Sequence, residues 1–302
     1  MSVIDGILPH VQRPSRYIDG ELNLASSGFD ESGFNMLLVF PDVYEIGMSH
    51  QGIRFLYERL SRIEGVGVEF AFSPWPDMEG MMRSCGEPLR SWQTRTEARL
   101  FDCIGFSLNY ELHYTNMLAM LELSGLDVRA SERGDGDPVV VAGGPCCSNP
   151  LPFIEAVDAV FLGDGEESLA EAVRAMISAG GSHAGRRAMT EALSGIEGVY
   201  VEGSTARAQY RIHRFEEPGL PRNPIVPSSS IVHDRLAVEI MRGCTRGCRF
   251  CHAGMINRPR RERGVDEIVD GVCAGLDASG WEEVSLLSLS SSDYSRLDEL
   301  LQ

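Results

Sequence analysis

Three cysteines stand close together in the segment RGCTRGCRFCHAG, at positions 244, 248 and 251. Their spacing, C-x3-C-x2-C, places three thiolates within eight residues, which is enough to occupy three corners of a cubane 4Fe-4S cluster. Because no fourth cysteine lies nearby, the fourth iron of such a cluster would keep an open coordination position. Cys244, Cys248 and Cys251 therefore predict an iron-sulfur centre that can take an additional ligand.

Three other kinds of cysteine site are alternatives. The residues CRFCH at 248–252 match C-x-x-C-H, the attachment motif of c-type haem, but that attachment takes place outside the cytoplasm and the sequence shows no export segment. A structural zinc site needs four ligands, and His252 directly follows Cys251, an awkward position for closing one tetrahedron. Eight cysteines with three in one loop also differ from the distributed framework of a disulfide-rich secreted fold. We prefer the cluster.

Two α/β units are expected to position these residues. Five segments of strand type alternate with helical patterns: 36–40, 66–72, 102–108, 138–144 and 156–163. The last two are continuous apolar runs, which are typical of parallel strands covered on both faces. The alternation predicts a doubly wound, flavodoxin-like or Rossmann-like domain over 35–180. The cysteine loop belongs to a second α/β unit, 236–302, in which a strand leads into the loop and a helix and a strand follow. We expect 1–34 to be an irregular lead segment, and the Gly-, Pro- and Ser-rich residues 181–235 to be a linker with one possible strand.

Composition limits the classes of function. The chain has 302 residues, 43% of them hydrophobic, and a formal net charge of -17. This charge opposes general attraction to nucleic acids and to anionic membranes. The N-terminus lacks a basic and apolar leader, and no run of about 18 uncharged apolar residues occurs. We expect a soluble cytoplasmic protein.

The other cysteines and the charges near the loop have ordinary explanations. Cys273 follows the spacing of an amphipathic helix, and we expect it, like Cys85 and Cys103, to be a packing thiol. The region of the cysteine loop is basic, although the chain as a whole is acidic. Its positive charges either bind an anion, such as the carboxylate of a cofactor or an anionic substrate, or form a solvated surface without a ligand. Its arginines are Arg242, Arg246, Arg249, Arg258, Arg260, Arg261 and Arg263.

The cysteine triplet, with Phe250 before its last cysteine and a strand before its first, resembles the cluster loop of radical S-adenosylmethionine (SAM) enzymes. The resemblance implies a partial or full (β/α) barrel, an open iron that chelates the amino and carboxylate groups of SAM, and one-electron cleavage of SAM to a 5'-deoxyadenosyl radical. In such enzymes the end of the second barrel strand receives the methionine amino group, often through a Gly-Gly-Glu-like motif, which is absent here. Ser290, Ser291 and Asp293 occupy the corresponding place, with a Ser-rich helix cap as the alternative.

The segment DVYEIGMSHQG, after the first expected strand, resembles the D-x-H-x-x-G loop of cobalamin-binding domains. Asp42 and Gly47 match that pattern, but Tyr44 replaces the cobalt-ligating histidine, and a neutral phenol with a pKa near 10 is a poor lower ligand. The cobalamin pattern also agrees with Ser107, and with Gly143 and Gly144, at the ends of later strands. The GDGEES segment at 163–168 resembles a further loop of these domains. A domain that binds no cofactor is the alternative; no dinucleotide or P-loop motif occurs.

Together with RPSRYIDGELN near the N-terminus, both halves resemble a bacterial family of radical SAM proteins with an N-terminal cobalamin-binding-like domain. The resemblance implies a 4Fe-4S cluster, SAM and a corrinoid as cofactors, and an electron donor such as flavodoxin or ferredoxin. Because a corrinoid can relay methyl groups, we expect methyl or methylthio transfer to a small or macromolecular substrate, with a rearrangement or another radical reaction as the alternative. A non-catalytic corrinoid-binding or electron-transfer module is the alternative. Only 67 residues run from Leu236 to Gln302, whereas a barrel needs about 200–250, so we expect a shortened chain that is inactive alone.

Overall fold

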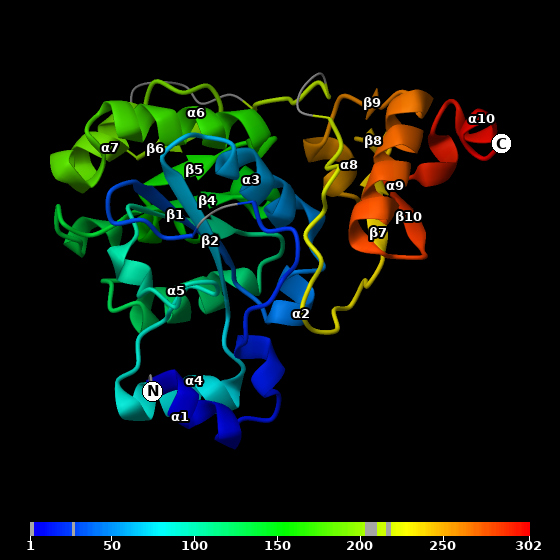
Figure 1. The fold of residues 1–302 in the computed structure, drawn as a ribbon. Helices are drawn as coiled ribbons and strands as arrows, with labels where there is room; N and C mark the ends of the chain where they lie inside the picture. Colours follow the sequence, from blue (N-terminus) through cyan, green and yellow to red (C-terminus); the bar gives the residue numbers. More distant parts are fainter. Residues whose placement is uncertain (1–2, 26–27, 203–209, 216–218) are drawn as a thin grey trace.

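A computed structural model describes residues 3–25, 28–202, 210–215 and 219–302 and shows two α/β units side by side (Figure 1). The first unit contains a six-stranded sheet of order β2-β1-β3-β4-β5-β6, in which β1 to β5 are parallel and β6 is antiparallel to β5. The strands are β1 (Phe34–Phe40), β2 (Val66–Phe72), β3 (Cys103–Ser107), β4 (Val139–Gly143), β5 (Ala159–Phe161) and β6 (Val199–Val201). The five parallel strands confirm the predicted doubly wound fold.

Both faces of this sheet are buried, as the continuous apolar runs predicted. Every residue of β1 and β2 is buried, because one hydrophobic core lies on each side of the sheet. One core contains α3 (Gln51–Ser61), α6 (Gly165–Ser178) and α7 (Gly185–Leu193); the other contains α1 (Val3–Ile7), α4 (Pro76–Cys85) and α5 (His113–Leu123). The short helix α2 (Tyr44–Gly47) follows β1. Figure 1 shows the two helical layers on opposite sides of the sheet.

The segments expected to be an irregular lead and a linker hold more structure than their composition indicated. Residues 181–235 contribute α7 and β6, because Met189 and Leu193 are almost fully buried against the first sheet. The lead segment contains α1, and Leu22 forms an antiparallel bridge with Val226. Short 3-10 turns occur at Leu8–His10, Pro14–Tyr17, Ala98–Leu100, Ala130–Glu132, Pro145–Ser148, Ile154–Ala156, Gly181–Ala184 and Ser291–Asp293.

The second unit begins a β/α barrel arrangement. Strands β7 (Leu236–Glu239) and β10 (Val284–Leu287) are parallel, and α9 (Val265–Ser279) connects and covers them. A small antiparallel ribbon, β8 (Met241–Arg242) with β9 (Arg261–Glu262), brackets the cysteine loop and α8 (Ala253–Ile256). Helix α10 (Leu297–Leu300) ends the unit. In the described part of the chain, no helix has the length and apolar character that crossing a bilayer requires.

Two of the three expected packing thiols are exposed. Cys103 is completely buried in β3, as predicted, whereas Cys85 and Cys273 are exposed. The prediction for Cys273 was wrong because glycines occupy the inner face of α9. A Cβ on Gly271 would come within 2.8 Å of Leu220, and one on Gly275 within 2.9 Å of Leu236. Cys273 lies between them in sequence, and its side chain therefore faces away.

Gly47 offers a test of packing in the first unit. A Cβ at this position would lie 2.4 Å from Phe72 and 3.2 Å from Phe40. We expect Gly47→Ala to lower the free energy of unfolding by about 1–3 kcal/mol because it overpacks the core. Gly80, exposed in α4 with nothing within 4 Å, is the matched control. Gly80→Ala should be neutral or stabilising by about 0.5–1 kcal/mol in urea unfolding; equal effects of the two substitutions would contradict this role for Gly47.

Candidate functional site

A cavity of about 350 Å³ lies between the two units, at the carboxyl edge of the first sheet. Open parallel sheets bind their ligands at this edge. The first unit contributes the ends of β1, β3, β4 and β5, and the second contributes residues of β7, β8, β9 and β10. The lining includes Leu38, Ser107, Val141, Gly143, Gly144, Phe161, Gly163, Glu239, Arg242, Arg261 and Leu287.

Three glycines line the cavity where β4 and β5 end. Gly144 has a φ of 107°, and a Cβ there would lie 2.6 Å from the carbonyl oxygen of Leu108. A Cβ on Gly163 would meet the Arg211 carbonyl oxygen at 2.2 Å. A Cβ on Gly143 would lie 3.7 Å from Phe161 Cβ, an ordinary van der Waals distance. The structure therefore brings the predicted residues Ser107, Gly143 and Gly144 together in the cavity lining, and the close backbone contacts of Gly144 and Gly163 leave no room for a side chain there.

The other three predicted cobalamin residues do not line this cavity. Tyr44 is 1% exposed, and its hydroxyl donates a hydrogen bond to Glu21 Oε1 at 2.7 Å. Burial, and then the hydrogen bond to Glu21, raise the pKa of Tyr44. Asp42 accepts hydrogen bonds from the Val43 N–H and the Tyr110 hydroxyl, and Gly47 packs beneath Phe72. These residues support the loop after β1 rather than the cavity.

His50 lines the cavity, although it matches no position of the motifs found in the sequence. It precedes α3, and its Nδ1 atom is enclosed without a hydrogen-bond partner in the described structure. Burial above all, and then the charges of Arg54 and His113, lower the pKa of His50 to about 4, against a side-chain hydrogen bond with Asn109 that acts to raise it. The imidazole is therefore neutral near pH 7. His50 belongs to the segment that connects β1 to α3, and segments that follow parallel strands are where open α/β sheets bind ligands.

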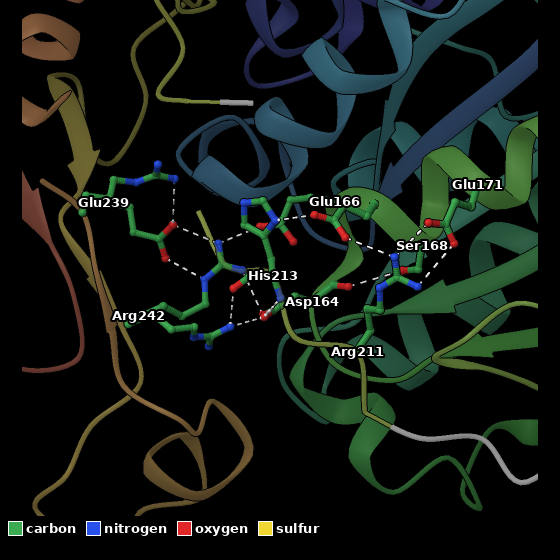
Figure 2. A network of polar contacts seen from close by, with 11 residues as sticks. Asp164, Glu166, Ser168, Glu171, Arg211, His213, Glu239 and Arg242 are labelled. Atoms are coloured by element: carbon green, nitrogen blue, oxygen red, sulfur yellow. Dashed lines mark hydrogen bonds and ion pairs between the residues drawn. The ribbon is translucent and has the colours of Figure 1, made fainter. Parts of the chain in front are cut away.

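A network of ion pairs joins the two units beside the cavity (Figure 2). Arg242, at the end of β8, has Nη1 2.9 Å from Asp164 Oδ1 and Nη2 2.6 Å from Glu166 Oε1. Its Nε lies 2.8 Å from Glu239 Oε1. Burial acts to lower the pKa of Arg242, but the carboxylates of Glu166 and Glu239 raise it well above the ordinary value. One guanidinium thus neutralises carboxylates of both units.

The network continues on both sides of Asp164, whose Oδ2 lies 2.5 Å from Arg261 Nη1 of β9. The same oxygen accepts a hydrogen bond from the His213 N–H at 2.8 Å. Burial alone would raise the pKa of Asp164, but Arg242 and Arg261 hold it below its ordinary value. Arg211 extends the network to Glu167 and Glu171 along α6, as Figure 2 shows for Glu171. The 163–166 loop therefore fixes the ribbon that carries the cysteines.

The three predicted cluster cysteines lie on the loop between β8 and α8. Cys248 is exposed, Cys244 and Cys251 are half-buried, and all three are free thiols. The Gly254 N–H donates to Cys251 Sγ at 3.3 Å, and the Arg246 N–H donates to Cys244 Sγ at 3.5 Å. Iron-sulfur thiolates accept backbone hydrogen bonds of this kind. Among the described residues, no three His, Cys, Asp or Glu side chains lie close enough together to form a metal-binding group. The three cysteines are therefore on one loop, but their sulfur atoms are not arranged around a common point.

The residues predicted to contact SAM lie at the end of β10, beside the cysteine loop. Asp293 receives a hydrogen bond from Arg246 Nε at 2.7 Å, and the Ser290 hydroxyl donates to its Oδ2 at 2.8 Å. Those hydrogen bonds, Arg246 first, lower the pKa of Asp293. Ser291 lies 2.9 Å from Ser288 between hydroxyl oxygens. The alternative of a Ser-rich helix cap is not supported, because α10 begins at Leu297 with no side-chain cap.

Two neighbours of the cysteines have different surroundings. Phe250 is 92% exposed and so packs against almost nothing within the chain. His252 Nε2 lies 3.0 Å from the Ser148 hydroxyl, a contact between the units that directs the ring toward the first unit. This contact disfavours His252 as a fourth ligand of a zinc site formed by the loop cysteines.

Removing Arg242 should loosen the contact between the units. We expect Arg242→Met to lower the free energy of unfolding by about 3 kcal/mol, because it leaves buried carboxylates from both units without a cation. Hydrogen exchange at the amides of β7 and β8 should become faster. The matched control is Arg296→Met, which breaks an exposed pair with Glu299 and should leave both measurements unchanged. Unchanged exchange in Arg242→Met would contradict the clamping role.

Comparisons with known proteins agree with this architecture. A family model described as radical SAM proteins, N-terminal, matches residues 52–202, half of the chain. The uncharacterized protein MJ0966 of Methanocaldococcus jannaschii is 25% identical over 269 residues, which cover 88% of this chain and 51% of that protein.

Solved structures show the same fold. Two structures of the radical S-adenosylmethionine methyltransferase TsrM from Kitasatospora setae match with TM-scores of 0.55 and 0.57 at 16% identity. One contains tryptophan and the SAM analog aza-SAM, and the other contains cobalamin and a 4Fe-4S cluster. The matches cover 88% and 89% of this chain and 50% and 52% of TsrM, so the chain spans about half the length of the relatives it matches. The resemblance read from the sequence is confirmed: the chain belongs to the family of radical SAM proteins that share this N-terminal domain.

Proposed function

We propose that this chain forms the cofactor-binding part of a radical SAM enzyme and holds a 4Fe-4S cluster at Cys244, Cys248 and Cys251. The observation that carries the proposal is the loop itself: three free thiols follow a strand of a parallel β/α unit, and two of their sulfurs accept backbone N–H groups. A bound cluster would supply one electron and an open iron for cleaving the sulfonium of SAM. The exposed thiol of Cys248 leaves room for it.

Residues at the end of β10 are suited to binding SAM. Asp293 is an ionised acceptor whose pKa is lowered by Arg246, a residue of the cysteine loop itself, and a carboxylate at this place can receive an ammonium group. Ser290 and Ser291 add hydroxyl groups at the same strand end, where barrel enzymes position their ligands. Phe250 presents an uncovered aromatic face beside the cluster cysteines. These four residues are proposed as SAM contacts.

A corrinoid is the proposed second cofactor, bound in the cavity between the units. Gly143 and Gly144 lie in its lining at the end of β4, and Leu38, Val141 and Phe161 contribute apolar side chains to it. His50, whose Nδ1 has no partner in the described structure, lies in the same lining. TsrM, which has a similar fold, binds cobalamin and is a methyltransferase. We therefore infer methyl or methylthio transfer, with flavodoxin or ferredoxin as the class of electron donor.

Cysteine variants test the cluster directly. After anaerobic reconstitution we expect about four irons and four sulfides per chain and a broad visible absorbance that dithionite bleaches. Cys244→Ala, Cys248→Ala and Cys251→Ala should each lose most of this iron, because two thiolates cannot hold the cubane. Cys85→Ala and Cys273→Ala, which remove exposed thiols elsewhere, are the controls and should bind iron like the unsubstituted chain.

The outcomes separate the candidate functions. Reductive formation of 5'-deoxyadenosine from SAM would mark the radical enzyme. The alternative outcome is a cluster that forms at the three cysteines but does not cleave SAM, under conditions in which full-length relatives of this chain do cleave it. That outcome would favour an electron-transfer module. Iron that binds equally well in all five variants would refute the assignment of the cysteine loop.

A further inference from the structure

We propose that a second cavity between the two units is a binding site for a small oxyanion, namely the carboxylate or phosphate group of a ligand, and that Arg54 binds this group. The cavity has a volume of about 140 Å³. Gln51, Phe55, Leu220 and Pro221 line both this cavity and the larger one, so the two cavities are neighbours. Oxyanion binding there requires neither the cluster nor the corrinoid.

Both units contribute to the second cavity. Helix α3 of the first unit contributes Arg54 and Glu58, and β7 of the second unit contributes residues 236–238. Gly271 of α9 and Ile225, which precedes the second unit, are also in the lining. A ligand held in this cavity would therefore contact both units.

Arg54 is an arginine that the fold buries without a carboxylate partner. It is 9% exposed, and its pKa is lowered by burial to about 10, against an opposing contribution from Tyr44. No carboxylate among the described residues forms an ion pair with it or acts on its pKa. Buried charges in proteins are ordinarily paired, because removing an ion from water without compensation is costly. A bound anion would supply the missing partner.

The three nitrogens of the Arg54 guanidinium have different surroundings. Nη1 donates a hydrogen bond to the Ile225 carbonyl oxygen at 3.2 Å. Nε is enclosed and has no partner in the described structure. Nη2 also has no hydrogen-bond partner there, but unlike Nε it is not enclosed. Because Arg54 lines the cavity, the N–H groups of Nη2 are open to a ligand, and guanidinium N–H groups bind carboxylate and phosphate oxygens well.

The charges of the lining also favour an anion. Among the described residues that line the cavity, Glu58 is the only carboxylate, and it already forms an ion pair with Arg62 of the same helix. The lining therefore contains two guanidinium groups and one carboxylate, although the whole chain has a formal net charge of -17. The positive charge left over belongs to Arg54, and it attracts anions to this cavity.

Titration calorimetry of the full chain tests the proposal with two probes, inorganic phosphate and acetate, in an amine buffer that contains chloride as its only other anion. We expect binding at one site per chain; tighter binding of phosphate would identify a phosphate group as the natural ligand group, and tighter binding of acetate a carboxylate. Arg54→Met should weaken this binding at least about tenfold, because it removes the charge and the N–H donors. Arg129→Met, which breaks an exposed pair with Glu155, is the control and should bind like the unsubstituted chain.

A second variant leaves Arg54 in place and fills the cavity instead. Ala237 lies between Leu236 and Val238, whose side chains belong to the core of the second unit, so alternation along β7 turns the Ala237 side chain the other way. Ala237→Leu should therefore exclude the probes and weaken binding at least about tenfold. Failure of the unsubstituted chain to bind either probe at concentrations up to about 10 mM would overturn the proposal. Affinity that is unchanged in folded Arg54→Met or in Ala237→Leu would place the anion elsewhere and overturn it as well.

Discussion

The ion pairs of Arg242 are the interaction on which the arrangement of the two units depends. A guanidinium placed among Asp164, Glu166 and Glu239 satisfies carboxylates that would otherwise repel one another in a partly buried position. The planar fork of arginine suits this task, because its nitrogens meet several carboxylates in fixed directions, which a lysine could not do. Since Arg242 is two residues before Cys244, the same contacts that join the units also fix the start of the cysteine loop.

This clamp explains why the cavity and the cysteine loop are close together. The 163–166 loop ends β5 and begins α6, so its position is set by the first sheet, and the ribbon of β8 and β9 is tied to it by Arg242 and Arg261. The contact between His252 and Ser148 connects the loop to the turn Pro145–Ser148 after β4, which directly follows Gly144. The chain therefore holds both proposed cofactor sites in one relative position through polar contacts, while apolar packing remains within each unit.

The sequence predicted those features that depend on local patterns, and it failed where the outcome depends on distant partners. Continuous apolar runs identified the parallel strands because both faces of that sheet are buried. The same patterns could not show that Tyr44 turns toward Glu21 and Trp92, residues distant in the chain. The place of His50 in the cavity lining could not be predicted for the same reason, since only the folded sheet brings it into one lining with Ser107 and Gly143. Helical spacing also led to a wrong prediction for Cys273. The spacing does not show that Gly271 and Gly275 form the face of α9 that packs against Leu220 and Leu236.

The basic character of the segment around the cysteines is largely neutralised in the folded protein. It looked like a patch for an anionic ligand or a solvated run, yet most of its arginines whose contacts are described here bind carboxylates of this acidic chain. Arg242 and Arg261 neutralise Asp164, Arg263 lies against Glu267, and Arg246 binds Asp293. Arg258 differs: it lines the cavity, and in the described structure its Nε donates to the Gly254 carbonyl oxygen at 3.2 Å with no ion pair. Most of the positive charge in this segment is therefore neutralised within the protein, and Arg258 is a cavity-lining cation for which the described structure shows no carboxylate partner.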